Sequence, residues 1–292
     1  MNYPLRKISK DEFPPSLLEI PEPPDELYVR GEMPSPDAVL LCVVGSRKYT
    51  NYGKDVCEEL ISGLAGYNIV IVSGLALGTD ATAHRSALKA GLKTLAIPGS
   101  GLNDDVIYPR SHFGLARDIL KSGGALLSEF LPDFRATVWS FPKRNRIMAG
   151  LCGATLIIEA SERSGTLITA RLALDYNRDV YVVPNSIFAD SSKGSNRLIR
   201  QGAMPITSSE DILSELGFDK SDKVNDMDKN SLSSLHNCSE KEIEIIAILE
   251  NPMPRNELAK KLGVGISEAN QLLMILEIKG LIKEETGLIR KR

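Results

Sequence analysis

The sequence predicts an α/β protein, with an extended Rossmann-like body built on a doubly wound, mainly parallel sheet and a small C-terminal winged-helix domain. Two observations predict this class. From Val39 onward, short apolar runs alternate with segments of helical periodicity, which is typical of a parallel sheet covered on both faces. A polar stretch then precedes a final segment with helical apolar spacing. The 292 residues suffice for one large domain or two smaller ones.

Residues 1–37 are predicted to be an extended, proline-rich arm. Prolines at positions 4, 14, 15, 21, 23, 24, 34 and 36 disfavour long helices and central strands in this stretch. The folded body is therefore expected to begin at residue 38.

Residues 38–218 are predicted to form the Rossmann-like body. Strands are expected at Val39–Val44, Ile69–Val72, Thr94–Ile97, Ala125–Leu127, Thr155–Glu159 and Val180–Val183. Helices are expected at Tyr52–Leu64, Asp80–Ala90, Phe113–Lys121 and Leu167–Tyr176.

Residues 219–239 are polar and are predicted to be a flexible linker to the winged helix at 240–292. Within that domain we expect helices at 240–250, 255–262 and 266–279, then a hairpin around Thr286-Gly287. The helix at 266–279 carries Glu268 and Glu277 against Lys279, which is a poor surface for reading a duplex. We therefore expect this domain to contact protein or support a dimer.

Composition excludes several classes of protein. No apolar run reaches about 18 residues and the N-terminus has no apolar signal core, so we expect a cytoplasmic protein without a membrane span. The four cysteines lie far apart without a C-x-x-C pair, which favours reduced thiols over disulfides or a metal site. With a net charge of −3, the chain is expected to bind a polyanion only at a local patch.

Small residues follow three of the expected strands. The turns are Gly45-Ser46-Arg47, Ser73-Gly74 through Asp80, and Ser161 through Gly165-Thr166. Such turns allow a ligand to approach the backbone, and three side by side are expected to form a row of phosphate-binding amides. The alternative is that they serve tight packing alone. None of these turns matches G-x-G-x-x-G or the P-loop, so the sequence lacks the motifs that usually indicate NAD binding or nucleotide hydrolysis.

A basic run near the middle of the chain predicts the partner. Lys143, Arg144 and Arg146 fall within four residues beside Asn145, and no acid occurs between positions 135 and 150. Phe141 and Trp139 offer an apolar face for an unstacked base, so single-stranded nucleic acid suits the run better than a free nucleotide. Further cations are expected from Arg47 and from Lys193, Arg197 and Arg200. The alternative is a solvated or ion-paired basic face.

Signals for catalysis are few. Asp80 and His84 have the i, i+4 spacing of an acid/base pair, but a helix cap and a packed histidine are favoured instead. Glu129 and Glu159 stand at strand ends, where they are expected to orient Arg or Asn side chains. Since no activated nucleophile or metal-ligand spacing emerges, we predict no catalytic residues, no metal and no cofactor.

The body resembles the DNA-processing protein A (DprA/Smf) family. The resemblance covers about 38–207, and its most specific pieces are Phe141-Pro142 with Arg144-Asn145-Arg146-Ile147, and Ser164-Gly165-Thr166-Leu167 with Thr169-Ala170. Other matching pieces are Gly45-Ser46-Arg47, Ser73-Gly74-Leu75-Ala76, Tyr108-Pro109, Glu159-Ala160 and Gly194-Ser195-Asn196.

The resemblance implies a non-catalytic protein that binds and protects single-stranded DNA and helps load the RecA recombinase during natural transformation. It also implies a homodimer. The DNA-binding residues expected from the turns, the basic run and the resemblance together are Gly45, Ser46, Arg47, Ser73, Gly74, Phe141, Lys143, Arg144, Asn145, Arg146, Gly165 and Thr166. Four phosphates neutralised on a single strand predict a slope of log K against log salt of roughly −3.

Two features set limits on this expectation. Leu77 stands where the family usually has an arginine, which implies weaker DNA binding. The rival function is a nucleotide-processing enzyme of the related phosphoribohydrolase-like Rossmann superfamily, whose glutamate-containing motif has its nearest counterpart here in 164–169, without the glutamate.

Overall fold

The structure is a computed structural model that describes residues 3–223, 241, 245, 248–249, 253–278, 281–285 and 288–291. It divides into two compact units, one before and one after the boundary between residues 224 and 225. Each unit is treated by itself below.

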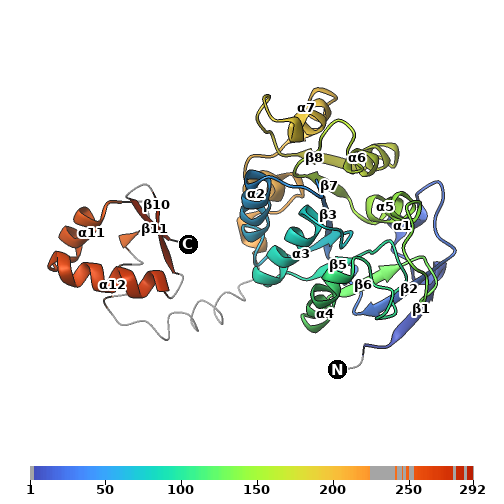
Figure 1. The fold of residues 1–292 in the computed structure, drawn as a ribbon, viewed down its shortest axis with the longest axis horizontal. Coiled ribbons are helices and arrows are strands. Elements are labelled where there is room, and N and C mark those ends of the chain that lie inside the picture. The colour runs from blue at the N-terminus through green and yellow to red at the C-terminus, as the bar shows by residue number, and fades with distance from the viewer. Residues whose placement is uncertain are drawn as a thin grey trace. The chain divides into compact units, whose positions relative to one another are not determined.

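A nine-stranded sheet forms the centre of the first unit, in the order β1-β2-β6-β5-β4-β3-β7-β8-β9 (Figure 1). The strands from β6 to β9 in this order pair in parallel, whereas β1 and β2 add an antiparallel edge. The strands are β1 (Leu5–Ser9), β2 (Glu26–Gly31), β3 (Val39–Val44), β4 (Ile69–Ser73), β5 (Thr94–Ala96), β6 (Ala125–Ser128), β7 (Ala154–Ile157), β8 (Asp179–Val182) and β9 (Met204–Pro205). The predicted fold class of this body, a mainly parallel Rossmann-like sheet, is confirmed.

Helices cover both faces of the sheet, because the strands bury both of their faces (Figure 1). On β3, Leu41 and Val43 pack in the core with α2, α3 and α8, while Cys42 and Val44 pack in the core with α1, α5, α6 and α7. The helices of this unit are α1 (Pro15–Leu18), α2 (Asn51–Ser62), α3 (Thr79–Lys89), α4 (Phe113–Lys121), α5 (Ser140–Leu151), α6 (Thr166–Asp175), α7 (Lys193–Arg200) and α8 (Ser209–Glu215). Cys42, Cys57 and Cys152 are buried and free, as predicted, and Cys238 lies outside the described residues.

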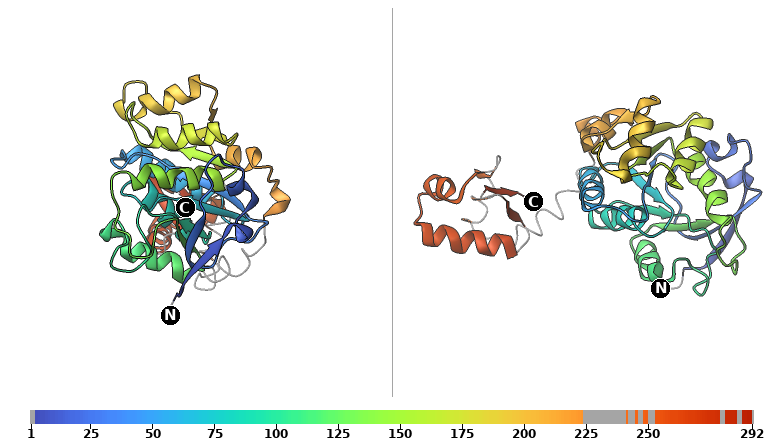
Figure 2. Two further views of the ribbon diagram at one scale, coloured as in Figure 1. Left: turned by 90° about the vertical axis from the view of Figure 1, so that its right-hand side faces the viewer. Right: turned by 45° about the horizontal axis from the view of Figure 1, so that its top comes forward.

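The prediction of an extended arm at residues 1–37 was wrong. β2 lies inside the sheet between β1 and β6 (Figures 1 and 2). Ile8, Leu17 and Leu27 are buried in the main core. The prolines fall before β1, at the start of α1 and on either side of β2. They therefore leave two proline-free windows, each long enough for a strand.

The second unit contains α11 (Arg255–Leu262), α12 (Ile266–Ile278) and a hairpin of β10 (Ile282–Glu285) and β11 (Leu288–Lys291). These elements lie where the sequence predicted two helices and two strands. Most of the expected linker, most of the expected first helix and the Thr286-Gly287 turn lie outside the described residues. The winged-helix assignment therefore stays a prediction.

Candidate nucleic-acid interface

The three predicted turns meet at one edge of the sheet. They follow β3, β4 and β7, and β3 pairs with both β4 and β7. The chain runs outward from β3 to β6 and then returns to β7 on the other side of β3. Ligands of open α/β sheets bind at such a switch point, outside the carboxyl ends of the strands.

Hydrogen bonds connect these turns directly. The backbone oxygen of Ser46 accepts from the backbone nitrogen of Thr79 at 3.1 Å, and the backbone oxygen of Gly45 accepts from Thr166 Oγ1 at 2.9 Å. A Cβ atom at Gly45 would lie 2.5 Å from Thr79 Oγ1, so glycine is needed for this close approach. The predicted row of turns is therefore one connected structure.

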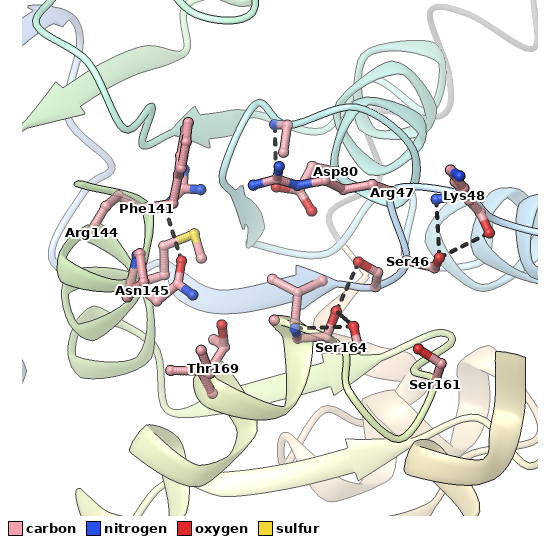
Figure 3. Close-up of a pocket in the computed structure, with 18 of the residues that line it drawn as sticks. Ser46, Arg47, Lys48, Asp80, Phe141, Arg144, Asn145, Ser161, Ser164 and Thr169 are labelled. Atoms are coloured by element: carbon pink, nitrogen blue, oxygen red, sulfur yellow. Dashed lines mark hydrogen bonds between the residues drawn. The ribbon is translucent and has the colours of Figure 1, made fainter. Parts of the chain in front are cut away.

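A groove of about 700 Å³ opens at this switch point (Figure 3). Phe141 and Asn145 of α5 lie on one side, and Ser46, Arg47 and Lys48 of the turn after β3 lie on the other (Figure 3). The remaining lining residues are Val44, Gly45, Ala76, Asp80, Val138, Pro142, Arg144, Met148, Ser161, Ser164, Gly165, Thr166, Ile168, Thr169, Asp190 and Ser191.

Arg47 and Lys48 supply the accessible positive charge in this groove. Both side chains are exposed, and neither forms an ion pair with any residue that the structure describes. The Arg47 guanidinium carbon lies 5.0 Å from the centroid of the Phe141 ring. These two cations are therefore available to an anionic ligand.

An aromatic pair borders the same place. The rings of Tyr108 and Phe141 have centroids 5.6 Å apart, and both line a smaller hollow beside the groove together with Arg47. Leu77 also lines this hollow and is half exposed. An arginine at position 77, which the family usually has, would therefore border the same hollow. The lining thus combines a guanidinium with aromatic faces, which suits an unstacked base.

Arg144 reaches the groove but is buried, with only 4% of its surface exposed. Its guanidinium donates to the backbone oxygens of Gly74, at 2.5 Å, and Ile97, which follow β4 and β5. Burial lowers the pKa of Arg144 to about 10, so the side chain stays charged at neutral pH. Arg144 therefore holds two strand ends together.

Asp80 is the acidic counterpart of this buried guanidinium. Its Oδ2 accepts from the backbone nitrogens of Gly74, at 3.1 Å, and Ala76, at 3.3 Å. Burial raises the pKa of Asp80, and the charge of Arg144 opposes that rise. Asp80 thus fixes the turn after β4 rather than pairing with His84.

The expectation that Lys143, Arg144 and Arg146 form one cradle was wrong. These residues lie on α5, where a rotation of about 100° per residue separates them. Positions 139, 143 and 146 share one face of the helix, whereas 141, 144, 145 and 148 share the opposite face. Only the second set includes residues that line the groove.

Lys143 and Arg146 instead share one carboxylate, that of Glu129 at the end of β6. Lys143 Nζ lies 3.4 Å from Glu129 Oε2, and Arg146 forms both an ion pair and a hydrogen bond with the same oxygen. Arg146 also donates to the backbone oxygen of Glu22 at 2.6 Å. Burial raises the pKa of Glu129, and the charges of Arg146 and Lys143 oppose this.

Two other predicted residues serve the fold. Ser73 is buried and donates to the backbone oxygen of Val43 at 2.6 Å, and the amide of Gly74 is already engaged by Asp80. Neither lines the main groove, although Gly74 lines the smaller hollow. Gly45, Ser46, Arg47, Phe141, Asn145, Gly165 and Thr166 do line the groove.

The sequence did not reveal Lys48, Tyr108 and Val138 as lining residues. Lys48 directly follows the predicted Gly45-Ser46-Arg47 turn, so its position was a usable signal. Nothing in the sequence around Val138 indicates its place. Lys193 forms an ion pair with Asp190 at 2.6 Å, and neither it nor Arg197 nor Arg200 lines the groove.

Glu159 behaves as predicted for a carboxylate that orients its neighbours. It is fully buried and accepts from the Thr50 backbone nitrogen at 2.9 Å, Thr50 Oγ1 at 2.7 Å, Asn185 Nδ2 at 3.3 Å and Ser191 Oγ at 3.2 Å. Thr50 in turn caps α2. Glu159 therefore ties α2 and two loops to the end of β7, beside the groove.

His84 is a packed residue, as the favoured interpretation predicted. It is fully buried and its Nδ1 lies 2.7 Å from Thr94 Oγ1. Burial lowers its pKa to about 3. No group of three potential metal ligands occurs among the residues that the structure describes. In that same part of the chain, none of the helices has both the length and the apolar character needed to cross a bilayer.

Comparison with known proteins decides the family. The family model of DNA recombination-mediator protein A matches residues 5–217. The chain belongs to the DNA recombination-mediator protein A family. The resemblance stated from the motifs is thereby confirmed, and the family match includes both N-terminal strands that the sequence had assigned to an arm.

Two relatives show how much of the chain the similarity covers. Protein Smf of Escherichia coli (strain K12) is 36% identical over 292 residues, which cover 98% of this chain and 76% of the relative. DNA processing protein DprA of Streptococcus pneumoniae is 40% identical over 216 residues, or 74% of this chain and 75% of the relative.

Solved structures of family members share the fold. DNA processing protein A from Streptococcus pneumoniae has a TM-score of 0.67 at 38% identity, covering 75% of this chain and 76% of that one. DNA processing protein A from Helicobacter pylori has a TM-score of 0.66 at 30% identity, covering 74% and 96%. The latter structure concerns that protein's single-stranded DNA binding mode.

Proposed function

We propose that this chain binds and protects single-stranded DNA in the switch-point groove and helps to load RecA on it. The observation that carries the proposal is the pair of unpaired cations, Arg47 and Lys48, beside Phe141 in an open groove. Phosphates contact the two cations, and a base rests on the aromatic face. The Helicobacter pylori relative, with its single-stranded DNA binding mode, supports this assignment.

The groove changes the expected salt dependence. Lys143 and Arg146 share Glu129, and Arg144 is engaged with backbone oxygens, so two accessible cations remain in the groove. Two neutralised phosphates on a single strand predict a slope of about −1.4 for log K against log salt. The roughly −3 expected from four cations belongs only to a strand that also reaches beyond the groove.

The test measures how tightly wild type, Arg47→Ala and Arg117→Ala bind a single-stranded oligothymidine and the same strand in a duplex. Each affinity is measured at two salt concentrations. Arg47→Ala is expected to weaken single-strand binding by roughly 10- to 150-fold, because a charge-assisted contact contributes about 1.5–3 kcal/mol. Arg117 is exposed on α4 and does not line the groove, so its variant is the matched control. Equal affinity of wild type and Arg47→Ala contradicts the proposal.

Loading of RecA and dimerisation are proposed with it, from the resemblance of the body to DprA/Smf proteins. RecA filament formation is to be measured on a strand coated with a single-strand-binding protein, with and without this chain. Sedimentation measures the oligomeric state. Release of free base from nucleoside monophosphates would instead favour the rival phosphoribohydrolase activity.

A further inference from the structure

The outer face of α5 carries an exposed indole. Trp139 is 55% exposed although tryptophan is highly buried on average in folded proteins. Its ring lies 5.8 Å from the Phe130 ring and 5.5 Å from the Phe134 ring, centroid to centroid. Phe130 and Phe134 stack on each other at 4.6 Å. The indole thus packs at a steep angle against two aromatic rings and keeps more than half of its surface exposed.

Positive charge accompanies this indole. Lys143 Nζ lies 5.9 Å from the Trp139 ring centroid and 5.6 Å from that of Phe130. Arg135 is exposed and forms no ion pair with any described residue. The cations Lys143 and Arg146 share the single carboxylate of Glu129, and Asp133 is the only other acid between positions 129 and 146. Within positions 129–146, the three cations outside the groove therefore outnumber the two carboxylates by one.

The chain passes directly from the groove to this surface. Val138 lines the groove, is 87% exposed and immediately precedes Trp139. Phe141, on the groove side of α5, is only two residues beyond Trp139. A strand that leaves the groove past Val138 thus meets the indole after turning around the first turn of α5.

We propose that Trp139 and Lys143 form a second stacking subsite for single-stranded DNA, reached by a strand that leaves the switch-point groove. This inference rests on the proposed function. One base stacks on the outer side of the indole, while a neighbouring phosphate approaches Lys143 and Arg135. Base–aromatic stacking tolerates any sequence, since every base has a π-face. A polyanion with planar bases matches an exposed indole flanked by cations better than an apolar peptide does.

The indole provides its own probe, because Trp139 is the only tryptophan in the chain. We would titrate the full chain with oligothymidines of about 4 and about 20 nucleotides, following tryptophan emission and the anisotropy of end-labelled strand. The longer strand is expected to quench the emission in step with the anisotropy. The slope of log K against log salt is expected to steepen from about −1.4 for the short strand to about −2.8 for the long one.

Variants separate stacking from packing. Trp139→Leu keeps an apolar side chain on Phe130 and Phe134 but has no aromatic face, and it is expected to lose roughly 5- to 100-fold in affinity for the long strand only. Trp139→Phe is expected to restore most of that loss. An unchanged thermal unfolding midpoint in both variants shows that the fold is intact.

The outcomes distinguish the two proposals. Binding of the long strand with unchanged tryptophan emission, and full affinity in Trp139→Leu, overturns the second subsite while leaving the groove in place. Such a result would assign the Trp139 surface to a protein partner. Failure of wild type to bind either strand, or equal binding by Arg47→Ala, overturns the proposed function itself and the second subsite with it.

Discussion

Arg144 shows that a basic residue in a family motif can serve the fold first. Its guanidinium bonds the backbone oxygens of Gly74 and Ile97 and lies near the buried Asp80 carboxylate. Arg144 lines the groove, and its assignment to the DNA-binding site stays a prediction. Its burial could not be foreseen, because an arginine within a basic run is ordinarily solvated.

Arg144→Ala is expected to lower the free energy of unfolding by about 2–4 kcal/mol, because it leaves two buried carbonyls without their donor and removes the positive charge near the buried Asp80 carboxylate. Urea unfolding of wild type, Arg144→Ala and Arg47→Ala checks this. Arg47 is exposed, so its variant should unfold like wild type. If Arg144→Ala is as stable as wild type, the anchoring role assigned to this residue is wrong.

His84 makes stability depend on pH on the acid side. Its pKa is about 3 in the folded protein, because of burial, against about 6.5 in an unfolded chain. The neutral form is therefore favoured by folding, so this stabilisation is complete above about pH 6.5 and is lost as the pH falls toward 3. The contribution changes by up to about 1.4 kcal/mol per pH unit within that window.

The measurement is the free energy of unfolding from pH 7 to pH 4 for wild type and His84→Leu. Thr94 Oγ1 still donates to the backbone oxygen of Ile71 at 2.7 Å in the variant, so no new unsatisfied hydroxyl arises. The difference between the two curves isolates the histidine from the carboxylates. Parallel curves would mean that His84 is protonated in the folded protein as readily as in the unfolded chain.

Among elements, the buried strands were the most predictable. β3, β4 and β8 lie within a residue of their expected bounds, and α4 and α11 match theirs at both ends. Their apolar runs and helical spacing are local signals. The N-terminal strands were missed because β2 gains its place from pairing with β6, a contact about 100 residues away along the chain. The prolines disfavour a central strand at their own positions, but they give no information about the proline-free segments between them.

α5 was missed for a related reason. Its basic run suggested a surface loop or first turn, whereas the helix runs on through buried Ile147, Met148 and Leu151. On a helix the cations of this run lie on opposite faces, so only part of the run faces the groove. The prediction of secondary structure and the prediction of the binding site therefore failed together at this one element.

Glu159 links elements that border the groove, and its replacement tests that link. Glu159→Gln replaces one of the two carboxylate oxygens with an NH2 group, which cannot accept a hydrogen bond. At least one of the bonds that Glu159 accepts from Thr50, Asn185 and Ser191 is then lost. We expect a loss of about 1–3 kcal/mol in the free energy of unfolding and weaker single-strand binding, since Ser191 lines the groove. Glu162→Gln, on an exposed carboxylate three residues later, is the control, and equal unfolding curves for the two variants would contradict the role.

At the scale of the whole molecule, each unit has its own core. The core of the second unit is formed by residues between 245 and 289, and the cores of the first unit by residues between 3 and 218. No core among the described residues includes side chains from both units. The groove and the Trp139 surface both belong to the first unit. Removal of the second unit should therefore leave the body folded.

A chain ending at Lys223 is expected to bind oligothymidine with the affinity of the full chain, within about twofold, since the groove and the Trp139 surface both belong to the first unit. Arg47→Ala in the shortened chain should lose the same factor as in the full chain, which controls for a change of binding site. A large loss of affinity on truncation alone would place a DNA contact in the second unit.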